Sequence, residues 1–208
     1  MPLEGHTQVK PGVTVVTPFH RQRRENGMLE RAAASVRAQT VPVHHICAED
    51  IHHLGAAITR THGLALVDTE WTAFLDSDDE MDPDHIEQLL SCQQETGADY
   101  VYPWFRVVGG SDPFPMFFGK PFDPAAPNST TITILVRTEL AKTIGFARDP
   151  AVQVSGEDFQ FTLGCIAAGA KIVHHPARTW TWFHGPQNTS GLPDRGDARA
   201  GNQRRRHR

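Results

Sequence analysis

The sequence predicts an α/β fold: a single domain in which helices flank a central sheet of mostly parallel strands. Two observations lead to this fold class. Short runs rich in apolar and β-branched residues alternate along the chain with longer segments whose apolar residues recur at helical spacing. The 208 residues, 39% hydrophobic and 21% charged, have the composition of one ordinary globular domain. We expect this domain to span residues 1–192, followed by a basic tail at 193–208.

The expected strands are short runs bounded by turn-forming or acidic residues. The first, Val13–Thr17, is strongly β-branched and lies between Gly12 and Pro18, which predicts a buried strand. The second ends in Glu49 and Asp50. Strands are expected over residues 13–17, 41–50, 70–79, 98–108, 129–137, 171–175 and 178–184.

The expected helices lie between these strands. One of them has especially clear boundaries: Asp82 is expected to be an N-cap, Pro83 suits the first turn, and Gly97 ends the helix. Helices are expected over residues 26–40, 54–67, 83–97, 138–146 and 156–170. Because ligands of open parallel sheets bind outside the carboxyl ends of the strands, we expect the functional site at that edge.

One segment, residues 109–128, interrupts the alternation. It is rich in Gly and Pro but also carries several Phe residues, so it is either a loop packed on the core or a mobile lid over a site. Cys47 and Cys165 lie in apolar runs and are interpreted as core residues, and packing in the core is favoured for Trp104 over stacking on a sugar.

Cysteine usage, charge and the termini exclude several classes of protein. The three cysteines are widely separated and form no Cys-x-x-Cys pair, so neither a zinc knuckle nor a disulfide framework is indicated.

No stretch approaches 18 apolar residues, and residues 1–12 have no apolar signal-like core, so we expect a soluble cytoplasmic protein without a transmembrane segment. The formal charge of −4 argues against a general nucleic-acid coat. The basic tail is either a disordered, solvated end or a tether to an anionic surface.

An acidic run directly follows the apolar part of the expected strand at 70–79. A calcium loop of the EF-hand type, with Asp76 as its first position, is disfavoured because Met81 stands where that loop needs glycine. The alternative is the Asp-x-Asp pair of Asp76 and Asp78. Two carboxylates on a turn that leaves a strand can face one crevice and hold a divalent ion that bridges a diphosphate.

Four motifs, in order along the chain, resemble those of inverting family 2 glycosyltransferases, which have the GT-A fold. The segment VTVVTPFHRQ resembles the first strand and nucleotide-binding turn of that family, and FLDSDD resembles its metal-binding Asp-x-Asp. The segment GAAITRTHGL resembles a glycine- and arginine-containing helix, with Gly55, Arg60 and Gly63 at the matching positions. The segment that begins SGEDFQF and ends TWFHGPQNTSG resembles the acceptor side. The resemblance spans residues 13–190 and implies transfer of a sugar from a nucleotide sugar, most simply a UDP-sugar.

The resemblance also implies roles for the metal and the catalytic base. Asp78 would hold a divalent cation, Mn²⁺ or Mg²⁺, with Asp76 near the ribose or the water ligands of the metal, and with His184 as a further ligand. Asp158 would be the general base that takes the proton of the acceptor hydroxyl, and Glu157 would either orient it or face outward. Direct attack by the acceptor would invert the anomeric configuration.

The resemblance likewise implies which residues hold the nucleotide of the donor. These candidates are Thr17, Pro18, Glu49, Asp50, Arg60 and Asp76. Only four residues, Ile51–Leu54, separate Asp50 from Gly55, so we expect a compact nucleotide pocket. The acceptor class stays open at this point and includes a glycan, a lipid, a protein side chain and a modified nucleic acid.

Two other functions remain as alternatives. A sugar nucleotidyltransferase can use the same layers and metal-binding carboxylates, but it normally has a glycine-rich loop with a lysine after the first strand. The segment PFHRQRRENG lacks that loop, although Arg21, Arg23 and Arg24 can contact phosphate. The other alternative is a non-catalytic sugar- or nucleotide-binding module, which would not need Asp158 as a base.

Overall fold

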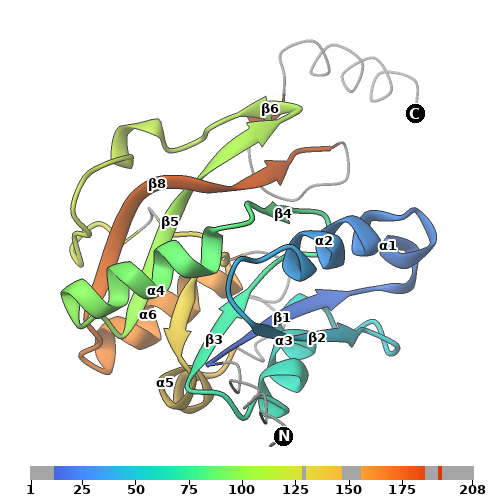
Figure 1. Ribbon diagram of the computed structural model, residues 1–208, viewed down its shortest axis with the longest axis horizontal. Helices are drawn as coiled ribbons and strands as arrows, with labels where there is room; N and C mark the ends of the chain where they lie inside the picture. The colour runs from blue at the N-terminus through green and yellow to red at the C-terminus, as the bar shows by residue number, and fades with distance from the viewer. Residues whose placement is uncertain (1–11, 128–129, 147–155, 186–191, 194–208) are drawn as a thin grey trace, which may run out of the picture.

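The computed structural model describes residues 12–127, 130–146, 156–185 and 192–193 (Figure 1). Within these ranges, a seven-stranded sheet has the order β2-β1-β3-β7-β5-β8-β4, and β6 pairs with β9 in a separate two-stranded sheet. The strands are β1 Val13–Phe19, β2 Val43–Glu49, β3 Trp71–Phe74, β4 Glu80–Met81, β5 Tyr100–Val108, β6 Gly110–Ser111, β7 Leu135–Arg137, β8 Ile172–Phe183 and β9 Leu192–Pro193. The helices are α1 Arg21–Glu25, α2 Met28–Arg37, α3 Ala56–Ala65, α4 His85–Thr96, α5 Thr138–Ile144, α6 Glu157–Ala167 and the 3-10 helix η1 Pro115–Phe117.

The strand directions confirm the expected fold class. β1 pairs in parallel with both β2 and β3, and β5 pairs in parallel with β8. Among the described strands of this sheet, β7, between β3 and β5, and the short edge strand β4 run against the others. The main sheet is therefore mostly parallel, and its parallel strands direct their carboxyl ends toward one edge.

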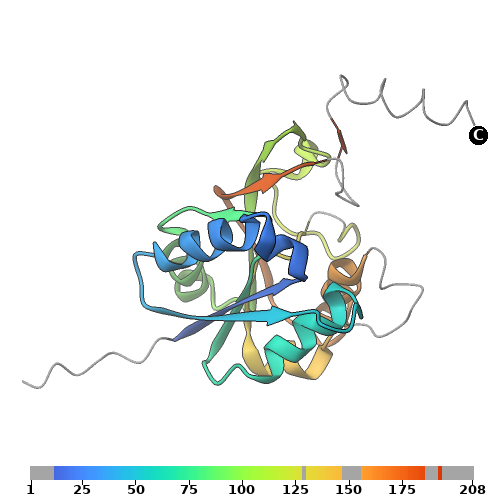
Figure 2. The same ribbon diagram turned by 90° about the vertical axis from the view of Figure 1, so that its right-hand side faces the viewer.

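Helices cover both faces of the sheet, and β1 shows how the sequence assigns its side chains to each face. Val13 and Val15 belong to a core cluster that includes side chains of α2 and α4, whereas Val16 belongs to a second cluster with side chains of α3, α5 and α6. This alternation follows from the two-residue period of a strand. Figure 2 shows α2 and α4 on one side of the sheet and α3, α5 and α6 on the other.

The N-cap expected for the helix at 83–97 is wrong. α4 begins at His85, with Asp84 at the N-cap position and no side-chain capping bond. The Asp82 carboxylate instead accepts a hydrogen bond from the Arg106 guanidinium on β5. The Asp82 carboxylate thus forms an ion pair with a residue of β5 and does not cap the helix. Only the tertiary structure brings Arg106 close to Asp82. Gly97 does end the helix, with a positive φ of 66°.

The two strands expected at 171–175 and 178–184 are one continuous strand, β8. Its pairing with β5 shifts register, because Tyr102 pairs with His174 but Trp104 pairs with Arg178. Three residues of β8, including Pro176, thus lie opposite one residue of β5. This bulge accommodates a proline that has no N–H group to donate to the ladder, so the strand continues past it. The strand expected at 129–137 is shorter than predicted, because β7 contains only Leu135–Arg137.

The described part of the loop at 109–128 is packed on the core, which confirms the first of the two interpretations. Phe114, Phe117, Phe118 and Phe122 all contact the cluster that covers one face of the sheet. Trp104 is fully buried in that cluster, as expected, and its indole Nε1 donates a hydrogen bond of 2.7 Å to Asp112 of the loop. These contacts hold the loop against the core.

The interpretation of Cys47 as a core residue is wrong, whereas Cys165 is buried as expected. Cys47 is exposed because β2 forms an edge of the sheet. The basic segment at 194–208 lies outside the described residues. The longest helix in the described ranges, α4, has 12 residues, and none of the described helices has the length and hydrophobicity that a membrane span needs.

Gly63 provides a direct test of how closely α3 packs on the sheet. A Cβ atom at this position would lie 2.5 Å from Val16 Cγ1 and 3.3 Å from Ala48 Cβ. Because these neighbours belong to β1 and β2, we expect Gly63→Ala to lower the free energy of unfolding by about 1–3 kcal/mol. Gly12→Ala is the control, since nothing lies within 4 Å of its added Cβ. Urea unfolding measures both variants, and equal stability of the two would contradict the close packing.

Candidate functional site

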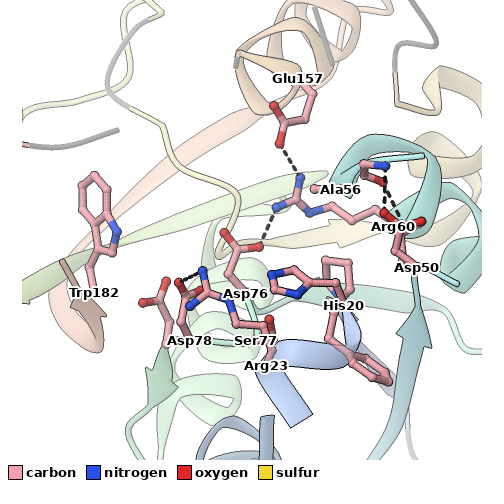
Figure 3. A pocket seen from close by; sticks show the side chains of 15 residues that line it. His20, Arg23, Asp50, Ala56, Arg60, Asp76, Ser77, Asp78, Glu157 and Trp182 are labelled. Carbon is pink, nitrogen blue, oxygen red and sulfur yellow. Dashed lines mark hydrogen bonds and ion pairs between the residues drawn. The ribbon is translucent and has the colours of Figure 1, made fainter. Parts of the chain in front are cut away.

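A cavity of about 290 Å³ lies at the edge where the carboxyl ends of β1, β2 and β3 meet, as expected from the parallel sheet. Its walls come from the end of β1 and the helix α1 that follows it, the turn after β2, the start of α3, the acidic turn after β3, the first residue of α6 and the end of β8. Figure 3 shows these side chains around the cavity. The lining residues are Pro18, Phe19, His20, Arg23, Asp50, Gly55, Ala56, Thr59, Arg60, Asp76, Ser77, Asp78, Asp79, Glu157 and Trp182.

Arg60 connects two walls of this cavity. Its guanidinium donates to Asp76 Oδ1 at 2.5 Å and to Glu157 Oε1 at 2.8 Å, and only 3% of the side chain is exposed. Burial alone would lower the pKa of Arg60, but the charges of Asp76 and Glu157 and their hydrogen bonds raise it above its ordinary value. Arg60 therefore remains a cation, and it joins the end of β3 to the start of α6.

The Asp78 carboxylate is paired with an arginine of α1, the helix that follows β1. Its Oδ2 lies 2.8 Å from Arg23 Nη2, and both side chains are largely buried. Burial, followed by the nearby charge of Asp76, raises the pKa of Asp78 above its usual range. Of the three arginines in the segment HRQRR, only Arg23 lines the cavity.

Asp79 is not among the candidates predicted from the sequence, and the structure places it at the base of the acidic turn. Its Oδ1 accepts a hydrogen bond of 2.9 Å from the backbone N–H of Phe183 at the end of β8. Burial and the neighbouring Asp78 raise the pKa of Asp79 well above its usual range. This bond connects the acidic turn to the strand that carries Trp182, another cavity residue that the sequence motifs do not single out.

The turn after β2 is closed by Asp50. The two oxygens of its carboxylate accept hydrogen bonds from the backbone N–H groups of Leu54, at 2.8 Å, and Gly55, at 2.9 Å. His53, within the turn, has a positive φ of 55°, which is uncommon for a residue other than glycine. The short spacing noted in the sequence thus produces a tight turn whose closing carboxylate also lines the cavity.

Two of the residues expected to hold a nucleotide do not line the cavity. Thr17 is fully buried, and its hydroxyl pairs with His45 Nε2 at 2.9 Å. Glu49 forms an ion pair with Arg24 at 3.0 Å. Pro18, Asp50, Arg60 and Asp76, in contrast, are all among the lining residues.

The two acids that open α6 differ in their contacts. Glu157 lines the cavity and is held by Arg60, as described above. The side chain of Asp158 is not among the lining residues, and its Oδ1 accepts a hydrogen bond of 2.7 Å from the backbone N–H of Phe159. Burial, followed by the charge of Glu157, raises the pKa of Asp158.

His184 lies just after β8, with its backbone N–H bonded to Val108 O at 2.7 Å and its ring 6.2 Å from that of Trp182. It does not line the cavity. In the ranges that the structure describes, no group of three or more His, Cys, Asp or Glu side chains is arranged to hold a metal ion. The structure therefore brings Asp76 and Asp78 to one cavity but does not bring His184 to it.

A family model, a curated protein and several solved structures are similar to this chain. A family model described as Glycosyl transferase family 2 matches residues 45–144. The succinoglycan biosynthesis protein ExoW of Rhizobium meliloti (strain 1021) is 30% identical over 188 residues, an alignment that covers 77% of this chain and 56% of ExoW. The chain thus spans just over half the length of this curated relative.

Solved structures of S. aureus TarS have a similar fold. TarS 1-349 in complex with UDP has a TM-score of 0.71 and 16% identity, with 84% of this chain and 61% of the TarS chain covered. The complex with UDP-GlcNAc has a TM-score of 0.72 and 17% identity, with 85% and 59% covered. This likeness, together with the family match, shows that the chain has the GT-A fold.

The pair of Thr17 and His45 leads to a pH-dependent prediction. Burial, followed by the charge of Arg37, lowers the pKa of His45 from 6.5 to about 4. A lowered pKa in the folded state means that the contribution to stability is complete above pH 6.5 and is lost as the pH falls toward the folded value. We expect His45 to account for about 1–3 kcal/mol of the stability lost between pH 7.5 and 4.5.

The measurement is urea unfolding of His45→Gln at a series of pH values. The variant should be less stable than the wild type at pH 7.5, and this difference should shrink at acid pH. His44→Gln is the control, because His44 is the exposed neighbour on the same strand. A difference between His45→Gln and the wild type that stays constant with pH would contradict the assignment.

Proposed function

We propose that the chain is a family 2 glycosyltransferase, which transfers a sugar from a nucleotide-sugar donor to an acceptor hydroxyl and inverts the anomeric configuration. The family model that matches residues 45–144 and the similarity to ExoW support this proposal. The observation that carries this proposal is the cavity at the carboxyl edge of the sheet. That cavity is lined by the carboxylates of Asp76 and Asp78, and the helix that bears Asp158 begins in its wall.

The donor is proposed to lie along the cavity with its nucleoside at the end formed by Pro18, Asp50 and Ala56. In Figure 3, Asp50 and Ala56 lie at one end, Trp182 lies at the other, and Asp76 and Asp78 lie between them. This arrangement suits a ligand with a base, a diphosphate and a sugar in a row. The complexes of TarS with UDP and UDP-GlcNAc support a uridine nucleotide as the first donor to test.

A divalent cation fits the donor atoms at the middle of the cavity. The charged lining side chains are five carboxylates and two arginines, so an anionic diphosphate would enter a region that is already negative. Mg²⁺ and similar ions are commonly held by one or two carboxylates together with phosphate oxygens and water. Such a site does not need three ligands from the protein. We assign Asp78 and Asp76 to this ion. Once bound, it would neutralise charge on the leaving diphosphate.

The role of His184 as a further metal ligand stays a prediction from its place after β8. The same holds for direct contacts of Thr17 and Glu49 with the donor. Arg60 acts on the donor through Asp76, because its guanidinium is committed to two carboxylates.

The general base is proposed to be Asp158. The acceptor hydroxyl would transfer its proton to this carboxylate while its oxygen attacks the anomeric carbon, and the bond from that carbon to the diphosphate would break on the opposite face. A pKa raised by burial makes a carboxylate a better proton acceptor near neutral pH. Glu157 is less suited to the role, because Arg60 holds its carboxylate at 2.8 Å.

Donor binding tests the first part of this proposal. UDP should raise the midpoint of thermal unfolding in the presence of Mn²⁺ and should have little effect in EDTA, because a ligand that binds the folded state stabilises it. Asp78→Ala should remove the part of the shift that depends on Mn²⁺. Asp84→Ala is a matched control from the same acidic run, since Asp84 does not line the cavity. An equal shift by UDP in EDTA and in Mn²⁺ would contradict the metal assignment.

The second test separates the base from the donor site. Asp158→Asn keeps the shape of the side chain and removes its ability to take a proton. Sugar transfer should fall by roughly 10²–10⁴-fold while UDP affinity stays within about twofold of the wild type. Release of UDP from a panel of UDP-sugars, with and without candidate acceptors, measures the first quantity, and titration calorimetry measures the second. Near-normal transfer by Asp158→Asn would place the base elsewhere.

A further inference from the structure

Arg23 forms an ion pair with Asp78, the carboxylate that we assign to the metal. Its guanidinium lies 2.8 Å from Asp78 Oδ2, and Figure 3 shows the pair at the wall of the cavity, beside Ser77 and Asp76. The side chains of Arg23 and Asp78 are only 17% and 16% exposed. The positive charge beside the Asp78 carboxylate is thus supplied by the chain itself.

Among the described residues, few other contacts hold the Arg23 guanidinium in this position. Its second hydrogen bond goes to the thioether sulfur of Met28, which is a weak acceptor. The helix that carries it, α1, has five residues and buries none of them. The position of the guanidinium therefore depends mainly on the Asp78 carboxylate.

Arg31, which also approaches the acidic turn, is held quite differently. It pairs with Glu80 at 2.8 Å, donates to the backbone carbonyl of Asp78, and covers the ring of Phe183 at 3.9 Å. None of these contacts involves the Asp78 carboxylate. Arg31 can remain in place when a ligand reaches that carboxylate, whereas Arg23 must respond to it.

We propose that Arg23 and the cation–diphosphate ligand exchange at Asp78. A divalent cation bound to this carboxylate would lie beside the guanidinium, and two like charges at that distance repel each other strongly outside bulk water. Arg23 would then leave Asp78 and turn to the diphosphate, because its planar fork of N–H groups matches phosphate oxygens. The exchange rests on the proposed function, since it requires a diphosphate donor in this cavity.

The exchange has a consequence that a purely structural ion pair would not have. Arg23 opposes binding of the cation when no diphosphate is present, but it supports binding of the diphosphate once the cation is there. Removing its charge should therefore change the two affinities in opposite directions. A merely structural residue would weaken both or neither.

The test uses Mn²⁺ and UDP as probes of the full chain. For Arg23→Gln, we expect the dissociation constant of Mn²⁺ alone, measured by the electron paramagnetic resonance signal of free Mn²⁺, to fall roughly three- to tenfold. The dissociation constant of UDP at saturating Mn²⁺, measured by calorimetry, should rise roughly ten- to hundredfold, because a charge-assisted hydrogen bond is lost.

Two further variants sharpen the result. Arg23→Lys keeps the charge but not the fork, so Mn²⁺ alone should bind as in the wild type and UDP should bind more weakly. This variant still decides the matter if Arg23→Gln does not fold, since UDP affinity equal to that of the wild type would overturn the exchange. Arg37→Gln is the matched control, because it removes an exposed arginine of α2 that pairs with Glu30 outside the cavity.

The outcomes separate the exchange from the proposed function. If the wild type binds UDP with Mn²⁺ but Arg23→Gln behaves like Arg37→Gln, or loses affinity for both probes, the exchange is wrong and the proposed function stands. If the wild type binds neither UDP nor another nucleoside diphosphate, with or without Mn²⁺, both are overturned. Circular dichroism and thermal unfolding confirm that each variant is folded.

Discussion

The buried guanidinium of Arg60 between Asp76 and Glu157 is the interaction on which the rest of the site depends. It joins the end of β3 to the start of α6, two elements that lie far apart in the chain. An unpaired charge at this depth would be very costly, so the position of each carboxylate constrains the other. Arg60 itself is placed by α3, whose close approach to β1 and β2 requires glycine at position 63.

A second constraint is the concentration of acid at one edge of the sheet. Burial raises the pKa of Asp78, Asp79 and Asp158, which shows that the fold holds these carboxylates where they are poorly solvated. Arginines and backbone N–H groups offset part of this cost. Stored electrostatic energy of this kind is typical of functional sites, where a ligand of opposite charge recovers it.

The sequence predicts the layers of the fold better than the contacts of individual side chains. Alternating periodicity is a local property, and it identifies the strands that form the cavity edge, so Asp50, Asp76 and Asp78 can be assigned to that edge from the sequence alone. The sequence does not show that Thr17 lies outside the cavity, because the direction of its side chain depends on the register of β1 within the sheet. The N-cap expected at Asp82 is wrong because the Asp82 carboxylate pairs with Arg106 instead. The two residues come close to each other only in the folded chain, so no local pattern predicts the pair. The partners of Asp79 are likewise set by tertiary structure, which no local pattern reveals.

The bulge in β8 bears on how sequences of this fold can change in length. Between the bulge and the cavity, β8 places Trp180 in the core and Trp182 at the cavity wall, two residues apart on one face. Deleting one residue at the bulge would shorten the stretch of β8 that lies opposite a single residue of β5 from three residues to two. The pairing of Trp180 with Phe105 would remain, so both indoles would keep their face. Deleting Thr181, where the two strands pair one to one, would instead turn Trp182 away from the cavity. The bulge and the loop at 109–127, which contains no strand of the main sheet, can therefore change in length without moving the cavity wall, whereas the end of β8 cannot.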